Sequence, residues 1–194
     1  MTDAQLLRVL SYIWAAFGIY WLTAGLKGKA AQTQESPRYR LLRLGILAIT
    51  FALLFWGRAA FGFLGRRFVF ESRIVSYAAF SLALAGLAVA VWARVHLGQY
   101  WSDKVVLKVD HQLIRSGPYA YMRHPIYSGV LLGVAGTALL LGELRGVLAL
   151  AILLSNYIIK AKREETILAA QFGDQFQQHM KSAGFLFPRF RARN

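Results

Sequence analysis

The stretch that decides the fold is Ile74–Ala93, IVSYAAFSLALAGLAVAVWA, which contains no charged residue. A helix needs roughly 20 apolar residues to cross about 30 Å of hydrocarbon, and this stretch has that length. It therefore predicts a transmembrane helix, and with it a membrane protein.

Four further apolar runs lie on either side of this stretch. Leu6–Leu26 and Leu41–Leu64 are long, and their few arginines lie close enough to the ends to reach the membrane interfaces. Ile126–Leu141 and Gly146–Ile159 are shorter, and only Gly142-Glu143-Leu144-Arg145 separates them, which predicts a tight helical hairpin. Runs this short also occur as buried core helices. Spans are favoured because the chain has no soluble domain for these runs to be the core of.

The sequence thus predicts an all-α integral membrane protein with about five transmembrane helices, in a single membrane domain of residues 1–194. The predicted spans are about 6–26, 41–64, 74–97, 126–141 and 146–160. Gly129, Gly133 and Gly136 place small residues at helical spacing in the fourth span, which predicts a helix-packing face. Thr2 and Asp3 stand where a signal peptide carries positive charge, so the first run is expected to be a span.

The composition agrees with a membrane protein and excludes several other classes. Hydrophobic residues make up 57% of the chain and charged residues 16%, whereas a soluble domain carries about 25% charged residues. The net charge of +14 alone would suggest nucleic acid, but the apolar excess argues against that partner. The absence of cysteine excludes disulfides, Cys-ligated metal centres and thiol catalysis.

The distribution of basic residues predicts the orientation in the membrane. The segments 27–43, 98–125 and 160–194 carry 16 of the 23 Lys and Arg residues and fall on one side of a five-span chain. The positive-inside rule makes that side, with the C-terminus, cytoplasmic. The predicted location is a prokaryotic inner membrane. A cluster of Arg66, Arg67 and Arg73 on the other side runs against the trend.

Two segments are neither spans nor short connections. Residues 98–127 read GQYWSDKVVLKVDHQLIRSGPYAYMRHPIY, far longer than a connection between neighbouring helices needs. Long loops on rigid scaffolds tend to carry function. Residues 160–188 continue the fifth span and contain Glu164 and Glu165, two adjacent acids in a basic protein, with Lys160 one helical turn before Glu164. We expect function in both segments.

The residue types in these segments narrow the chemistry. The histidines lack the spacing of metal ligands, so no metal site is predicted. Ser128 is four residues after His124, but nothing completes a hydrolase triad. A basic, aromatic loop and a glutamate pair instead suit a zwitterionic, nucleotide-like ligand. Aromatic rings such as that of Tyr119 would cover its base, and a glutamate would accept from its ribose hydroxyls or its ammonium.

The motifs in these two segments resemble those of a known family. The pattern comprises His111-x-Leu113-Ile114-x-x-Gly117-Pro118-Tyr119, Arg123-His124-Pro125-x-Tyr127, Glu164-Glu165, Phe172-Gly173-Asp174 and Phe187-Pro188. It resembles the isoprenylcysteine carboxyl methyltransferase family, which is related to phospholipid N-methyltransferases. The resemblance covers residues 97–190, and over the first 95 residues it is only hydropathic.

The resemblance implies S-adenosylmethionine as methyl donor. Its pocket would lie at the cytoplasmic face, formed by the loop before the fourth helix and by the C-terminal helix. The cofactor-binding residues that the resemblance implies are His111, Gln112, Leu113, Ile114, Tyr119, His124, Pro125, Ile126, Tyr127 and Glu164. The residues implied to hold the acceptor's carboxylate are Lys160 and Arg163. Lys160 stands where the family leads us to expect an arginine, which is a bidentate donor rather than a point charge.

The function implied is membrane-embedded methylation of the carboxylate of a lipophilic, isoprenylcysteine-like acceptor. Phospholipid amine N-methylation, small-thiol S-methylation and a scaffold or sensor that retains the pocket are the alternatives. Arg123 and Glu165 are the predicted catalytic residues: Arg123 would orient an acceptor carboxylate or support the loop. A carboxylate needs no general base at pH 7, whereas an amine acceptor would give Glu165 or His124 that role. Membrane lipids are the other predicted partners, and the oligomeric state is left open.

Overall fold

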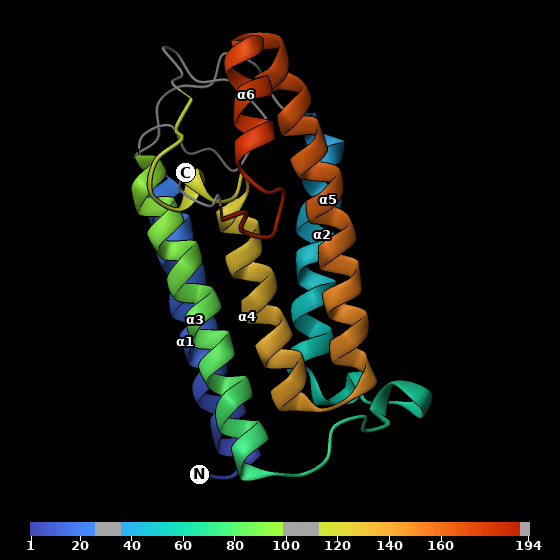
Figure 1. The fold of residues 1–194 in the computed structure, drawn as a ribbon. Helices are drawn as coiled ribbons and strands as arrows, with labels where there is room; N and C mark the ends of the chain where they lie inside the picture. Colours follow the sequence, from blue (N-terminus) through green and yellow to red (C-terminus); the bar gives the residue numbers. More distant parts are fainter. Residues whose placement is uncertain (26–35, 99–112, 191–194) are drawn as a thin grey trace.

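The computed structural model describes residues 1–25, 36–98 and 113–190, and helices are the regular secondary structure of these ranges (Figure 1). In these ranges five long helices pack side by side with alternating direction, and a short sixth helix lies at one end. The α-helices are α1 (Asp3–Gly25), α2 (Pro37–Phe55), α3 (Arg73–Leu97), α4 (Pro125–Leu141), α5 (Leu144–Phe172) and α6 (Asp174–Ser182). Three 3-10 helices are η1 (Gly57–Ala59), η2 (Gly62–Gly65) and η4 (Gly117–Ala120). The predicted all-α membrane fold is confirmed.

Three helices, α1, α3 and α5, are long and apolar enough to cross a membrane. The apolar helix α4 is shorter, and α2 begins with three arginines, Arg38, Arg40 and Arg43. The helix α4 packs against α3, α5 and α1, and α2 lies at the side of the bundle against α5. Five spans, and their arrangement in one domain, stay a prediction.

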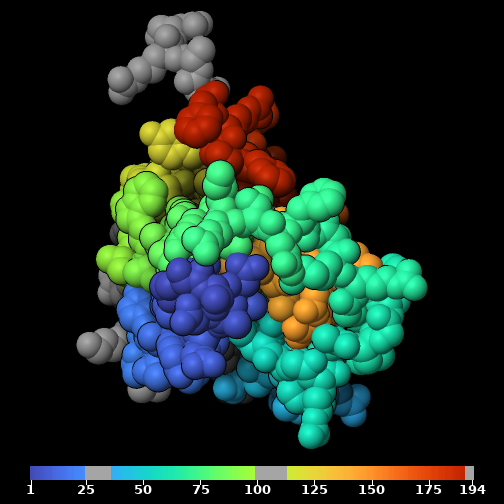
Figure 2. Space-filling model, turned by 90° about the horizontal axis from the view of Figure 1, so that it is seen from below, coloured from blue at the N-terminus to red at the C-terminus, as the bar shows by residue number. Residues whose placement is uncertain are grey.

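The two ends of the bundle differ. At one end lie the segment that precedes α4, the last turns of α5 and all of α6 (Figure 1). At the other end lie the N-terminus and the segment 56–72, which spreads over the end face (Figure 2). The described residues of the motifs therefore lie at the first end.

In the region of the second predicted span, 41–64, the helix has other bounds. The helix begins earlier, with Pro37 in its first turn, and it ends at Phe55. Arg145, from the first turn of α5, donates through Nη1 to the carbonyl oxygens of Leu53 and Trp56, each at 3.0 Å. These bonds satisfy carbonyl groups that a longer helix would have used, and the helix ends there although apolar residues such as Phe61, Phe63 and Leu64 follow.

The predicted hairpin between the last two long helices is confirmed. Gly142 follows α4 with φ of 70° and donates its amide to the carbonyl oxygen of Ala138 at 2.9 Å. A left-handed residue at this position ends a helix, and glycine adopts it without strain. The helix α5 then runs on to Phe172, and its 29 residues are more than the roughly 20 that a hydrocarbon core requires.

The glycines of α4 form a packing face, as predicted. A Cβ atom on Gly129 would lie 2.5 Å from the amide nitrogen of Ala90 on α3, and one on Gly136 would lie 2.4 Å from that of Ala83. Across the same helix, the Trp14 indole of α1 donates to the hydroxyl of Thr137 at 3.0 Å. Small residues thus bring α3 and α4 into backbone contact, which fixes the start of α4.

Candidate active site

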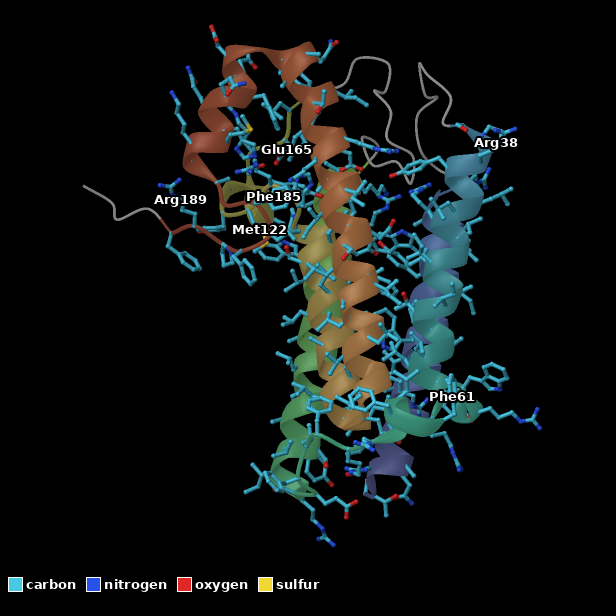
Figure 3. The ribbon with its side chains drawn as sticks, turned by 90° about the vertical axis from the view of Figure 1, so that its right-hand side faces the viewer. Arg38, Phe61, Met122, Glu165, Phe185 and Arg189 are labelled. Carbon is cyan, nitrogen blue, oxygen red and sulfur yellow. The ribbon has the colours of Figure 1, made fainter. Side chains whose placement is uncertain are left out.

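The candidate site is built where the loop before α4 meets the C-terminal segment. The amide of Arg123 donates to the carbonyl oxygen of Gly184 at 2.8 Å, and that of His124 to Phe185 at 3.3 Å. In return the amide of Gly184 donates to the carbonyl oxygen of Tyr121 at 3.0 Å. Figure 3 shows Met122, Glu165 and Phe185 together at this end, with Phe61 at the other. The described parts of the two predicted functional segments, from Leu113 and from Lys160 onward, therefore form one structural unit.

A glycine with positive φ shapes the loop before α4. Gly117 has φ of 57°, and a Cβ atom there would lie 2.7 Å from the imidazole of His96. That imidazole lies 2.9 Å, Nε2 to Oγ, from Ser116. The short helix η4 that follows turns Tyr119 inward, where it is buried against Ala93 and Ile126. Burial raises the pKa of the Tyr119 phenol, which therefore stays protonated at neutral pH.

Arg123 and Glu165 form an ion pair at the centre of the unit. The guanidinium Nε donates to Oε1 of Glu165 at 2.6 Å, and Nη1 donates to the carbonyl oxygens of Ala183 and Met180 at 2.6 and 3.3 Å. His124 Nε2 lies 3.1 Å from the same carboxylate oxygen. Two roles were predicted for Arg123: orienting an acceptor carboxylate and supporting the loop. Because three groups of the protein already accept its hydrogen bonds, the geometry favours the second role.

Glu164 has different partners and a more open setting. It accepts a hydrogen bond from the Tyr127 hydroxyl, and its carboxylate lies 3.7 Å from Nδ1 of His124. The Lys160 ammonium is 3.9 Å away. The side chain of Glu164 is 21% exposed and that of Glu165 16%. The imidazole of His124 thus lies between the two acids, one ring nitrogen toward each.

Aromatic rings stack beside this cluster. The rings of His124 and Tyr127 are parallel with centroids 5.5 Å apart, and Tyr157 stacks on Tyr127 at 4.7 Å. The edge of His124 meets Phe185 at 5.3 Å. The Lys160 ammonium lies over the Tyr127 ring at 5.2 Å. The stack holds the imidazole in a single orientation toward the acids.

The two residues predicted to hold an acceptor carboxylate have separate surroundings. Lys160 is buried and faces Glu164, whereas Arg163 is exposed and lies 4.2 Å over the ring of Tyr39, on α2. Arg163 and Tyr39 also line a groove of about 520 Å³ between α2 and α5. Arg163, rather than Lys160, therefore has access to a ligand in this groove.

A buried histidine supports the same end of the molecule. His179, on α6, has its pKa lowered to about 4, first by burial and then by the positive charges of Arg123 and Arg115. It is neutral at physiological pH. In the described ranges, no group of three His, Asp or Glu side chains is placed as metal ligands would be.

Most of the predicted site residues lie close together, and two of them fall outside the described residues. Leu113 and Ile114 precede η4, and Ile114 packs against the cluster of Tyr119 and Ile126. Pro125 is buried at the first position of α4. His111 and Gln112 lie outside the described residues. The sequence did not predict three further residues of this end: Tyr39, Tyr157 and Phe185. Each is an aromatic residue a few positions from a lysine or arginine, and this pattern is too common to indicate a site.

Comparison with known proteins tests the family resemblance of the motifs. The model of the isoprenylcysteine carboxyl methyltransferase family matches residues 79–170. A protein-S-isoprenylcysteine O-methyltransferase of Schizosaccharomyces pombe is 37% identical over 92 residues, which are 46% of this chain and 39% of the relative. A probable protein-S-isoprenylcysteine O-methyltransferase of Oryza sativa subsp. indica is 28% identical over 163 residues, 82% of this chain and 83% of the relative. The chain spans about two fifths of the length of the first of these.

A solved structure has a similar fold. The eukaryotic intramembrane Ras methyltransferase ICMT superposes with a TM-score of 0.51 at 22% identity, covering 81% of this chain and 54% of that one. At this identity the likeness concerns the fold. The resemblance predicted from the motifs is therefore confirmed: residues 79–170 match the isoprenylcysteine carboxyl methyltransferase family, and the chain has the membrane fold of a solved member.

Proposed function

We propose that the protein is an S-adenosylmethionine-dependent methyltransferase that esterifies the carboxylate of a lipophilic, isoprenylcysteine-like acceptor at the cytoplasmic membrane surface. The observation that carries the proposal is the different setting of the two adjacent acids. Glu165 is engaged by Arg123 and His124, while Glu164 is the more exposed of the two. One acid thus organises the site, and the other remains available to a ligand.

The residues present fit the cofactor. S-adenosylmethionine supplies, when bound, a methyl group on a positively charged sulfonium. Glu164 provides carboxylate oxygens for an ammonium or for ribose hydroxyls. The ring of Tyr119 and the apolar side chains of Ile114 and Ile126 provide a wall for a base. We assign the remaining predicted contacts, His111, Gln112, Leu113, His124, Pro125 and Tyr127, to the same pocket by resemblance.

The position of Glu164 suits an acceptor with one end in the bilayer. It follows Leu144, the first residue of α5, by twenty residues, which is about 30 Å of helix rise and matches the thickness of the hydrocarbon. If α5 begins at one interface, Glu164 lies at the other. An acceptor bound there would have its polar head in water and its apolar chain in the lipid.

The groove between α2 and α5 suits the apolar chain of such an acceptor. Leu42, Ile46 and Ile152 line its walls, and Arg163 lies next to Glu164 in sequence. A guanidinium beside apolar walls suits an amphiphile with an anionic head. We therefore assign the acceptor's carboxylate to Arg163 and its chain to the groove, with Lys160 adding positive charge behind Glu164.

The chemistry needs little from the protein beyond placement. A carboxylate acceptor is ionised at neutral pH, so no residue has to remove a proton. An anion and a cation become neutral products, and a site of low polarity favours that change. An amine acceptor would need Glu165 or His124 as a base, but both are already held in the network with Arg123. That engagement favours O-methylation over N-methylation.

The test is transfer of tritium from labelled S-adenosylmethionine to candidate acceptors by the protein in lipid nanodiscs. The acceptors are an N-acetylated S-farnesylcysteine, phosphatidylethanolamine and a hydrophobic thiol. We expect label in the farnesylcysteine as a base-labile ester. Label in the amine or the thiol would overturn the acceptor assignment. Cofactor binding without transfer to any acceptor would favour the scaffold or sensor alternative.

A further inference from the structure

The end of the molecule opposite the candidate site carries a basic and aromatic surface. We name residues 56–73 the platform; it covers much of the end face in Figure 2. Its exposed rings are those of Trp56, Phe61, Phe63, Phe68 and Phe70, of which Phe70 is 92% exposed. Its exposed arginines are Arg58, Arg66, Arg67 and Arg73. The proposed reaction uses none of these residues.

The platform is held in a fixed position on the bundle. The amide of Phe68 donates to the carbonyl oxygen of Gly142 at 2.9 Å, and the amide of Leu144 donates to that of Arg66 at 3.0 Å. These bonds pair the platform with the turn between α4 and α5. Arg145 fixes its beginning through the carbonyl oxygen of Trp56. The rings and arginines are therefore displayed by an ordered backbone.

The charge of the platform is strongly unbalanced. The segment has four exposed arginines and one acid, Glu71. The carboxylate of Glu71 lies 3.7 Å from Nη1 of Arg67. The guanidinium of Arg66 lies 5.4 Å over the ring of Phe63. Like charges gathered on an ordered surface repel one another, and bound anions relieve that repulsion. The orientation rule does not account for them, since this is the end with fewer positive charges.

We propose that the platform binds the phosphate groups of anionic phospholipids in the leaflet opposite the candidate active site. Guanidinium groups bind phosphate oxygens in pairs of hydrogen bonds. Tryptophan favours the headgroup level of a bilayer, phenylalanine inserts at the boundary between headgroups and acyl chains, and this end is one membrane thickness from Glu164 if α5 spans the bilayer. Five exposed rings favour a lipid over a soluble anion, which would leave them in water.

The test compares nanodiscs of phosphatidylcholine with nanodiscs that also contain phosphatidylglycerol. Hydrogen exchange is measured for peptides covering residues 56–73, and bound phosphatidylglycerol is counted by native mass spectrometry. We expect slower exchange in these peptides when phosphatidylglycerol is present. The triple variant Arg58→Gln, Arg66→Gln, Arg73→Gln is expected to bind the lipid at least about tenfold more weakly, because three positively charged phosphate donors are lost.

Two matched variants make the result specific. Replacing the same three arginines with lysine keeps the charge and is expected to keep most of the binding. Replacing Arg38, Arg40 and Lys162 with glutamine removes three exposed charges at the other end and is expected to leave the protection of residues 56–73 unchanged. Equal exchange in both kinds of nanodisc would overturn the proposal even if a variant fails to fold. Equal protection by inorganic phosphate would overturn the lipid assignment.

Discussion

Arg123 donates from Nε to Oε1 of Glu165 at 2.6 Å, across 42 residues of sequence. This ion pair joins the turn before α4 to the C-terminal part of α5. Both side chains are largely buried, with 13% and 16% exposure. Arg123 also donates to the carbonyl oxygens of Met180, in the last turn of α6, and of Ala183, which follows it, so one guanidinium holds three segments together.

Arg123→Ala is therefore expected to destabilise the fold. It leaves the Glu165 carboxylate buried without its cation, a loss that typically costs about 3–5 kcal/mol. Thermal unfolding in nanodiscs measures the effect. Glu71→Gln is the control, because the side chain of Glu71 is 78% exposed and its loss should change the stability by less than about 0.5 kcal/mol. An unchanged melting temperature with lost transfer would make Arg123 a substrate contact instead.

Glu164→Gln is expected to weaken binding of S-adenosylmethionine while leaving the fold intact. Hydrogen bonds to a charged group contribute about 1.5–3 kcal/mol, so the dissociation constant should rise at least about tenfold. Isothermal titration with the cofactor and its demethylated product measures this. Glu165→Gln is the matched comparison, because it should lower the melting temperature more than Glu164→Gln does. Equal cofactor affinity in Glu164→Gln and the unmodified protein would remove Glu164 from the pocket.

The sequence predicted those features that depend on local pattern. Hydrophobic runs located the helices, Gly142 marked the hairpin, and the spacing of Gly129 and Gly133 marked a contact face. The motifs brought Arg123, His124 and Glu165 into one proposal, and the structure places these three in contact.

Features that depend on long-range contacts were not predictable in this way. The end of α2 at Phe55 is set by hydrogen bonds from Arg145, which lies about ninety residues further along the chain. The pairing of Tyr39 with Arg163 joins α2 to α5, and Tyr39 lies in the half where the resemblance is only hydropathic. Hydropathy reports whether a residue suits lipid or water, but not which distant side chain contacts it.

Arg163→Gln is expected to raise the KM for a carboxylate acceptor at least about tenfold with little change in cofactor affinity, because a charge-assisted hydrogen bond would be lost. Arg163→Lys keeps the charge, so its KM should lie between those of the unmodified protein and Arg163→Gln. Steady-state transfer with varied farnesylcysteine gives KM and kcat separately. A fall in kcat at constant KM would contradict the assignment of Arg163 to the acceptor.

Gly136→Ala is expected to destabilise the bundle, because the new Cβ atom would lie 2.4 Å from the amide nitrogen of Ala83. Overpacking of this kind costs about 1–3 kcal/mol. Gly18→Ala is the matched control: no atom lies within 4 Å of its added Cβ, so the stability should be unchanged or slightly higher. Thermal unfolding of both variants measures the effect. Equal melting temperatures would show that α3 and α4 can move apart without a loss of stability.

His179 predicts how stability depends on pH. Burial, then the charges of Arg123 and Arg115, lower its folded pKa to about 4, whereas the unfolded value is about 6.5. Between these values the unfolded chain binds the extra proton and the folded protein does not. Stability from this group is therefore complete above about pH 6.5 and is lost as the pH falls toward about 4.

The check is thermal unfolding across this range for the unmodified protein, His179→Gln and His96→Gln. His124 and Glu165 also act on His179, and they are kept in all three proteins. Removing His179 should flatten the dependence on pH, since its proton uptake on unfolding is gone. Removing the exposed His96 should leave the dependence in place. An unchanged slope in His179→Gln would assign the acid sensitivity to another group, because the other titrating residues are the same in each protein.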